Sequence, residues 1–558
     1  MMYISTPAAY SQVKPNIEWY HCCLFPFYMF AISISNAFKS EPADNSILIV
    51  NTETESVTQK TGLPKGPWGY GSMISAGNKV VLGRGEISIF RYGVGSEYKN
   101  KGNSILIIDA VKETVNEKVV NSYARWGYES TAVAGNKVVM GRDAYSRGSS
   151  ILIVDIEKGL VTEKGGFSEA IWGGNNSIAV TGNKAVIGHG YGHSNDNNKG
   201  GTSIIIVDTV KGTVTEKGGL SKAYWGARGS IAVAGNKVIM GPGFGHSILI
   251  IDTEVGTVIE KDSLSIANWG DESIAVAGNK VVMGGSNLFG NGTSILIIDT
   301  VKGTVTEKGG LSEAYWGYRS TAVADDKVIM GCWGYNKGNS ILIIDTIKET
   351  VKEKRGLSKS TWGFASTVVV GNKVIMGRGD NEGNSILIID PVKDTVVEKK
   401  GLSKAQWGYE STVVAGNKVV MGPGKYSEGG SILIIDAEKE TVSERKGLSK
   451  ADWGYESIAV AGNKVVMGRK QGKSVLIVDT AKGTVAEKGG LSEASWGAGG
   501  SMAVAGNKVV MGPGYGTSIL VVDTETETIT EKSGFPAANW GLRAIAVAGN
   551  KVIMGPGD

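Results

Sequence analysis

Few side chains in this sequence have the types and spacing that chemistry requires. Four histidines occur, at positions 21, 189, 193 and 246. His189 and His193 are four residues apart, a spacing that brings two metal ligands together only on a helix, and no helical pattern covers them. We therefore predict no metal site, and we expect His189, His193 and His246 to be solvated side chains of loops.

The sequence also lacks motifs for nucleophilic catalysis and for cofactor binding. Cys332 has no partner motif that would activate a thiol, and no glycine-rich loop follows a strand and opens a helix, as phosphate binding requires. The aspartate that ends each "SILIID" segment could join a ring of carboxylates, but its place at a turn favours capping of the backbone. We predict no catalytic residue and no cofactor, so an enzyme is the least favoured class of function.

The residues that return most regularly belong to an internal repeat, which occurs eleven times. "SILIID" or a close variant returns at spacings of 43 to 58 residues between Ser46 and Ser518. "AGNKVVMG" and a Trp-Gly pair return equally often. The tryptophans of these pairs are Trp68, Trp126, Trp172, Trp225, Trp269, Trp316, Trp362, Trp407, Trp453, Trp496 and Trp540. Repeats of this length indicate a solenoid or a propeller.

Each repeat contains four short segments with β character. "SILIID" is an apolar run that suits a strand covered on both faces, whereas "TVTEK" alternates and ends in charges, as an outer edge strand does. "TVVA" and "KVVM" flank the pair Gly416-Asn417, a two-residue hairpin signal in which we expect both residues to take the left-handed backbone. Ten of the eleven repeats have Gly-Asn here, and the eleventh has Asp325-Asp326.

Four antiparallel strands in about 45 residues, repeated many times, are typical of a β-propeller blade. The repeats, with "STVVAGNKVVMG" followed by "SILIID", resemble those of the Kelch and YVTN propeller families over residues 46–558. We label the strands A to D from the axis outward. The chain begins with C and D (46–60) and ends with A and B (544–555), so the first blade would be completed by C-terminal strands, which removes the exposed sheet edges.

The number of rings is open at this stage. Eleven blades exceed the usual four to eight, and two rings, of five and six blades, satisfy the same strand order. The sequence therefore predicts an all-β propeller of eleven four-stranded blades in one large ring or two rings. We favour two, with the division between residues 285 and 340.

Strand direction places the variable segments on one face. The A–B and C–D turns share a uniform face, the turn face, and the B–C loops and D–A connections share the other, the loop face. Because binding residues favour loops on a rigid scaffold, we expect the loop face to bind. Our candidate binding residues are Trp333, Tyr335, Tyr191, Phe244, Phe289, Tyr426, Tyr515, Tyr128, Tyr318, Tyr409 and Tyr455.

The repeated tryptophans allow two interpretations. One tryptophan in each repeat, from Trp126 to Trp540, is most simply a structural wedge between neighbouring blades. The alternative is a ring of exposed aromatic platforms, which the aromatic residues that follow several Trp-Gly pairs would extend.

Residues 1–45 precede the repeats. Residues 22–37 contain an apolar stretch that is too short for a stable transmembrane span, followed by the small residues Ser35 and Ala37, which suit signal cleavage. The segment is either a secretory signal, and the protein is then secreted, or a disordered or loosely docked terminus of a cytoplasmic protein. If the leader is cleaved, Cys332 is the only remaining thiol, and in a eukaryotic secretory route Asn175 and Asn291 are acceptor sequons for glycans.

The balance of charged residues limits the classes of partner that the sequence predicts. The 58 basic and 54 acidic side chains are interspersed and leave a formal charge of +4, so nucleic acid is not predicted as a partner. Two classes of function remain ahead of an enzyme: a noncatalytic recognition or scaffolding propeller that binds a protein, and a multivalent lectin-like propeller that binds a glycan.

Overall fold

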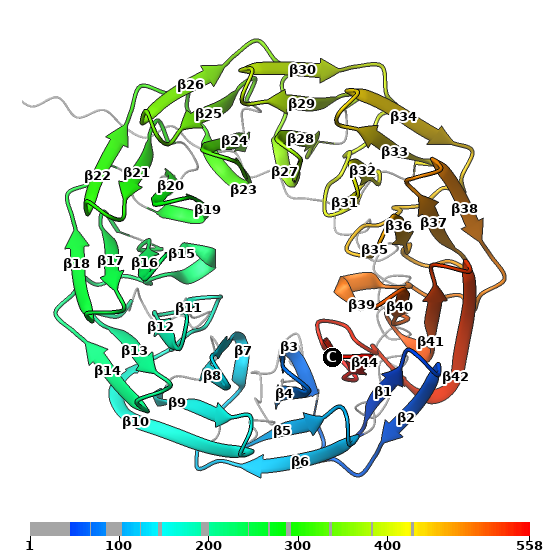
Figure 1. Cartoon of the computed structure of the whole chain (residues 1–558), viewed down its shortest axis with the longest axis horizontal. Helices are drawn as coiled ribbons and strands as arrows, with labels where there is room; N and C mark the ends of the chain where they lie inside the picture. The colour runs from blue at the N-terminus through cyan, green and yellow to red at the C-terminus, as the bar shows by residue number, and fades with distance from the viewer. Residues whose placement is uncertain are drawn as a thin grey trace, which may run out of the picture. The chain divides into compact units, whose positions relative to one another are not determined.

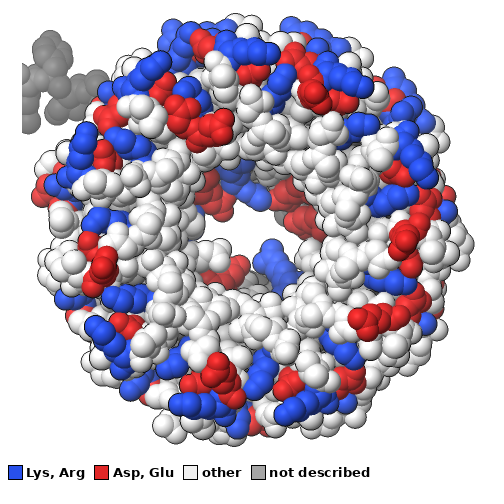
Figure 2. All heavy atoms as spheres, in the orientation of Figure 1, with Lys and Arg blue, Asp and Glu red and all other residues white. Residues whose placement is uncertain are grey.

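The structure, a computed structural model, contains eleven four-stranded antiparallel sheets among the residues that it describes. Asp44–Asp558 form one compact unit, in which the sheets are blades of a single ring around an open central channel (Figures 1 and 2). The described residues are 45–66, 68–84, 103–122, 124–142, 148–190, 200–243, 245–265, 268–285, 292–333, 338–380, 383–425 and 429–557. The leader, apart from residue 45, lies outside them.

Each blade contributes one strand to each of four concentric layers (Figure 1). The innermost A strands are β3 (Trp68–Ala76), β7 (Trp126–Ala134), β11 (Ile178–Thr181), β15 (Ile231–Ala234), β19 (Trp269–Ala277), β23 (Tyr315–Ala324), β27 (Trp362–Val370), β31 (Thr412–Ala415), β35 (Ile458–Ala461), β39 (Met502–Ala505) and β43 (Ile545–Ala548). The B strands are β4 (Lys79–Arg84), β8 (Lys137–Arg142), β12 (Lys184–Ile187), β16 (Lys237–Met240), β20 (Lys280–Gly285), β24 (Lys327–Trp333), β28 (Lys373–Arg378), β32 (Lys418–Met421), β36 (Lys464–Met467), β40 (Lys508–Met511) and β44 (Lys551–Met554).

The two outer layers carry the remaining strands. The C strands are β1 (Ile47–Asn51), β5 (Ser104–Asp109), β9 (Gly148–Asp155), β13 (Ile204–Asp208), β17 (Ile248–Asp252), β21 (Ile295–Asp299), β25 (Ile341–Asp345), β29 (Ile386–Asp390), β33 (Ser431–Asp436), β37 (Val475–Asp479) and β41 (Gly516–Asp523). The outermost D strands are β2 (Ser56–Lys60), β6 (Thr114–Val119), β10 (Leu160–Ala170), β14 (Thr213–Lys217), β18 (Thr257–Lys261), β22 (Thr304–Lys308), β26 (Thr350–Lys354), β30 (Thr395–Lys399), β34 (Thr441–Lys446), β38 (Thr484–Lys488) and β42 (Thr528–Ala538). Two short 3-10 turns, η2 (Ala227–Gly229) and η3 (Ala498–Gly500), interrupt this pattern.

The ring closes by strand complementation, as the order of the segments predicts. β1 pairs with β44, and Ile49 lies opposite Ile553, so the closing sheet runs β2-β1-β44-β43. The expected division into two rings between residues 285 and 340 is wrong. There, β20, β21 and β22 stay in one sheet and β23 to β26 form the next, with no second pair of closing strands. One ring therefore contains all the blades.

The A–B turns differ in one respect from the expectation. Gly416 has a φ of +63°, whereas Asn417 is not among the residues of positive φ, so only the first turn residue is left-handed. This is the pattern of a type II′ hairpin turn. In the repeat without Gly-Asn, Asp325 takes the left-handed position, with a φ of +53°, which a short polar side chain tolerates.

The tryptophans of the Trp-Gly pairs lie between blades. Each of the eleven is at most 1 % exposed. Trp407, for example, packs against Ile386 and Ile388 of the preceding blade and against Val419 of its own. Its indole Nε1–H donates to the carbonyl oxygen of Ser403 at 2.9 Å, and the serine amide donates to a carboxylate oxygen of Glu444 in β34. The segment "LSKAQW" thus anchors the D–A connection and the wedge together.

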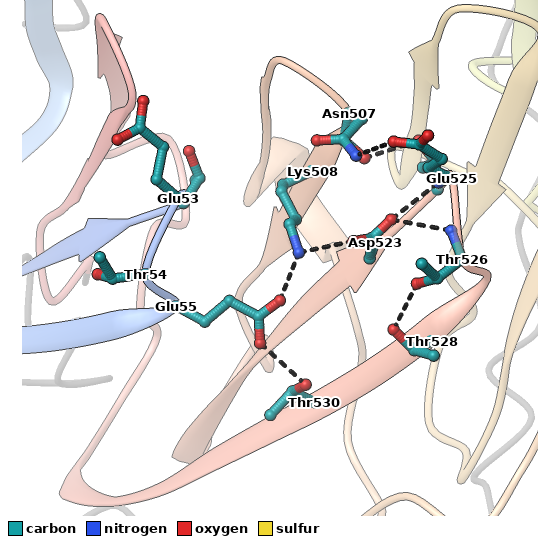
Figure 3. Close-up of polar contacts among 12 residues, drawn as sticks. Glu53, Thr54, Glu55, Asn507, Lys508, Asp523, Glu525, Thr526, Thr528 and Thr530 are labelled. Carbon is teal, nitrogen blue, oxygen red and sulfur yellow. Dashed lines mark hydrogen bonds and ion pairs between the residues drawn. The ribbon is translucent and has the colours of Figure 1, made fainter.

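A lysine opens each B strand on the turn face, and most of these lysines contact the next blade. Lys508 contacts Asp523 of its own blade and Glu55 of the next, which is the blade that closes the ring (Figure 3). Asp523 also accepts two amides of its turn, which is the capping role expected for this aspartate. Lys373 and Glu440 make the same contact between two internal blades. The closing junction therefore uses the same side chains as internal ones.

Candidate binding site at the channel mouth

The A strands line the channel, and the third residue after each repeated tryptophan has an unusual backbone. All eleven of these residues have φ between +41° and +60°, nine of them non-glycine, and the backbone bulges here, as the register of β23 shows. Their peptide groups join adjacent blades. The Glu410 amide donates to the Ala365 carbonyl at 2.8 Å, and the Glu456 amide donates to the Glu410 carbonyl at 2.9 Å. Left-handed non-glycine residues cluster where function or tight packing requires them.

Six aromatic side chains meet on one side of this wall, and we call them the aromatic arc. They come from four consecutive blades and are Tyr315, Tyr318, Trp333, Phe364, Tyr409 and Tyr455. The Tyr318, Phe364, Tyr409 and Tyr455 rings stack in sequence with centroids 5.5 to 6.0 Å apart. Trp333 lies at the end of β24, where the B–C loop begins, so the arc lies at the loop-face end of the channel.

Neighbouring rings along the arc are nearly parallel. The planes of Tyr318 and Phe364 differ by 18°, and those of Tyr409 and Tyr455 by 11°. The Lys425 ammonium lies 5.6 Å from the centroid of Tyr455 and covers the end of the stack. Burial raises the pKa of Tyr318 to about 12. The arc consequently presents ring edges and protonated hydroxyls, which donate hydrogen bonds at neutral pH.

Charged side chains accompany the arc. Arg319 lies 2.5 Å from a carboxylate oxygen of Glu410 and 3.4 Å from one of Glu272. Burial, and then the nearby Glu410 charge, raise the pKa of Glu456 above its usual range. Figure 2 shows acidic and basic side chains inside the channel opening. The mouth therefore combines aromatic edges with charges of both signs.

A smaller aromatic pair lies elsewhere in the same layer. Tyr128 stacks on Tyr70 with centroids 5.9 Å apart, and burial raises its pKa to about 12. Arg543 lies 3.9 Å from Glu129 beside this pair. Tyr128 is thus a channel residue like those of the arc, but it is not one of them.

The structure brings four of the predicted binding residues together: Trp333, Tyr318, Tyr409 and Tyr455 form the arc with two aromatic residues outside the candidate set, Tyr315 and Phe364. Phe364 occupies the second position after a Trp-Gly tryptophan, a signal that the sequence does contain. Tyr515 is 56 % exposed and lies in the B–C loop between β40 and β41, outside the arc. The other candidates lie outside the described residues: Tyr191, Phe244, Phe289, Tyr335 and Tyr426.

His189 is not the solvated loop residue that we expected. It is buried, and its ring centroid lies 4.4 Å from that of Trp172. In other blades an arginine takes this place, as Arg142 does over Trp126. The prediction is wrong because His189, two residues after the end of β12, packs on the wedge tryptophan and is not part of the solvated loop. His246 is exposed, and His193 lies outside the described residues.

The burial of His189 has a consequence for acid stability. Desolvation lowers its pKa from 6.5 to about 4, so the unfolded chain binds a proton between these values and the folded chain does not. His189 therefore supports folding above about pH 6.5, and this support is lost as the pH falls towards 4. Between pH 6.5 and 4 the wild-type protein should lose about 2–4 kcal/mol of unfolding free energy through His189. The His189→Phe variant, which keeps a ring on Trp172, should not show this loss.

Urea denaturation of both proteins at pH 7.5, 6, 5 and 4.5 tests this expectation. Between pH 6.5 and 4.5 the unfolding free energy of the wild-type protein should fall more steeply than that of the variant. Parallel curves across the whole range would show that His189 titrates alike in the folded and unfolded chains.

The described residues offer little support for nucleophilic or metal chemistry. Cys332 is buried beside the Ser360 carbonyl, and burial raises its thiol pKa, which disfavours the nucleophilic thiolate. In the described part of the chain, no cluster of three or more His, Cys, Asp or Glu side chains is arranged to hold a metal ion. Nor does that part contain a helix of the length and apolarity that crossing a bilayer requires.

The fold and the wall of the channel define the chain as an eleven-bladed β-propeller. No protein-family model and no curated protein matches it. Among solved structures it is similar to dihydro-heme d1 dehydrogenase NirN in complex with DHE, at 11 % identity and a TM-score of 0.36, over 61 % of this chain and 72 % of that one. It is also similar to apo AztD from Citrobacter koseri, at 13 % identity and a TM-score of 0.33, over 62 % of this chain and 93 % of the other.

Proposed function

We propose that this protein is a noncatalytic recognition propeller that binds a protein partner at the loop-face mouth of its channel. The observation that carries the proposal is the aromatic arc, which concentrates six aromatic side chains from four consecutive blades on one side of the mouth. Tyrosine and tryptophan are among the side chains that most often dominate the binding energy of protein interfaces. Because the ring of blades already holds these residues in place, little conformational entropy is lost on binding.

The geometry of the arc favours a polypeptide over a sugar as its ligand. A sugar ring that stacks on an aromatic residue needs an open ring face, whereas the Phe364 and Tyr409 rings each stack between two aromatic neighbours. The exposed edges and hydroxyls suit apolar side chains and backbone carbonyls. Arg319 and Glu456 add charges of both signs that can fix the orientation of a peptide.

Alanine substitutions in the arc test this function. The blades of η2 and η3 have Ala227 and Ala498 at the position of Tyr318, Tyr409 and Tyr455, so a Tyr318→Ala/Tyr409→Ala/Tyr455→Ala variant should fold. The probe is a peptide selected on the wild-type protein from a displayed random library. We expect its dissociation constant, measured by fluorescence anisotropy, to increase at least tenfold, because hot-spot residues each contribute about 2 kcal/mol or more.

The matched control changes the opposite face. Asn279→Ala/Asn372→Ala/Asn417→Ala removes three exposed amides from A–B turns and should leave peptide affinity within a factor of two. Failure to select any peptide, or a selected peptide that loses affinity in the control and keeps it in the arc variant, would refute the assignment of the mouth as the binding site.

A further inference from the structure

Cavities lie on the turn face, whose turns are uniform in sequence. Three pockets of about 500, 410 and 530 Å³ occur at equivalent junctions between neighbouring blades. Each is lined by A–B turn residues of both blades and by C–D turn residues. These volumes fall within the range of small-ligand sites, about 300–1,000 Å³.

At each of these three junctions the lining combines at least one turn asparagine with two lysines and at least two carboxylates. One pocket contains Asn372 and Asn417 from the two A–B turns, the strand lysine Lys373 and the turn lysine Lys393, with Asp390 below them. Lys373 contacts Asp390 and Glu440 of the next blade. Ion pairs of this kind hold donors and acceptors in place before a ligand arrives, which lowers the entropic cost of binding.

The charges of the lining nearly cancel. Two of the pockets combine two lysines with two carboxylates, and the third combines Lys280 and Lys302 with three aspartates. Because the lining carries both positive and negative side chains, it disfavours a strongly charged ligand such as a phosphate. They suit a neutral molecule whose groups donate and accept hydrogen bonds at the same time.

In two of these pockets, apolar side chains of the C–D turns form part of the wall. Val301 is 72 % exposed and Ile347 is 73 % exposed, and both line one pocket. Val210, in the equivalent place, lines another. A surface of hydroxyl-binding groups beside a small aliphatic patch matches a sugar ring, which presents hydroxyls at its rim and C–H groups on its faces.

We propose that the junction pockets of the turn face bind single units of a neutral carbohydrate, one per junction, so that the ring is a multivalent receptor. Each site alone would bind weakly. A polymer that reaches several junctions would gain avidity without any new contact, because each further binding event becomes intramolecular. The near-identity of the repeats is what equal sites around a ring require, and this inference is independent of the function proposed for the channel mouth.

Methyl glycosides of glucose, galactose, mannose and N-acetylglucosamine, with the same sugars coupled to a polymer, are the probes. Isothermal titration of the monomeric sugars should give more than one site per chain, and surface binding of one polymer should be at least a hundredfold tighter than that of its monomer. The channel mouth offers a single site, so stoichiometry separates the two surfaces.

A ten-residue variant tests the location. It changes to alanine every asparagine of the A–B turns, namely Asn78, Asn136, Asn183, Asn236, Asn279, Asn372, Asn417, Asn463, Asn507 and Asn550. We expect polymer binding to fall at least tenfold in this variant, with the thermal transition as the check on folding, and to be unchanged in the arc variant. No binding by any probe, one site per chain, or binding that survives in the folded asparagine variant would overturn the proposal.

Discussion

Replacing Trp407 or Trp453 with alanine is expected to destabilise the ring by roughly 3–5 kcal/mol, as other truncations of large buried aromatic residues do. Both indoles are fully buried between two blades, and each donates a hydrogen bond to a backbone carbonyl, Trp453 to Ser449 at 2.9 Å. The substitution leaves a cavity and an unpaired carbonyl at the junction. Chemical denaturation at constant pH measures the change in unfolding free energy.

A half-buried aromatic residue supplies the control for this measurement. Tyr409 lies two residues after Trp407 and lines the channel, and its equivalents in other blades include Ala498. Tyr409→Ala should therefore cost much less than Trp407→Ala. Equal costs, or a stable Trp407→Ala protein that loses only ligand binding, would contradict the wedge role of the tryptophan.

Gly422→Ala is expected to be as disruptive, although it adds only a methyl group. A Cβ atom at Gly422 would lie 1.9 Å from the carbonyl oxygen of Trp453 in the next blade. Because that oxygen belongs to the backbone, no side-chain rotation relieves the clash, and the two blades must move apart. We expect a loss of roughly 3 kcal/mol or more, at the upper end of overpacking effects.

Gly218 is the matched control for Gly422. It has no positive φ that would disfavour alanine, and a Cβ there would have no atom within 4 Å. Gly218→Ala should change the unfolding free energy by no more than about 0.5–1 kcal/mol, and in the stabilising direction, because the unfolded chain loses freedom. A tolerated Gly422→Ala would mean that adjacent blades are not packed through this glycine.

The local elements were predictable because each has a chemical signature within a few residues. The apolar run of β33, the charged end of β34 and the Gly416 turn follow from the alternation and turn preferences of the sequence. The order of the first and last segments also predicts the pairing of β1 with β44. These features depend on neighbours along the chain, and a repeat displays them many times.

Properties that depend on contacts between repeats were harder to predict. The number of blades in the ring follows from the angle at which each wedge holds two blades, and no segment of the sequence encodes that angle, so the expected division into two rings was wrong. Nothing in the sequence around Gly422 indicates that the Trp453 carbonyl of the next blade lies against it. The arc was partly visible as aromatic residues after Trp-Gly, but the stacking of Phe364 on Tyr318 requires the curvature of the ring.

The lysine contact that closes the ring bears on how the number of blades can change during evolution. Lys508 meets Glu55 across the two ends of the sequence in the same way that Lys464 meets Glu527 between internal blades. Duplication or deletion of one whole repeat in the gene therefore leaves each junction with a strand lysine and a wedge tryptophan. Blade number can drift by unequal recombination without new side-chain chemistry, and the only cost is a small change of angle shared among all the junctions.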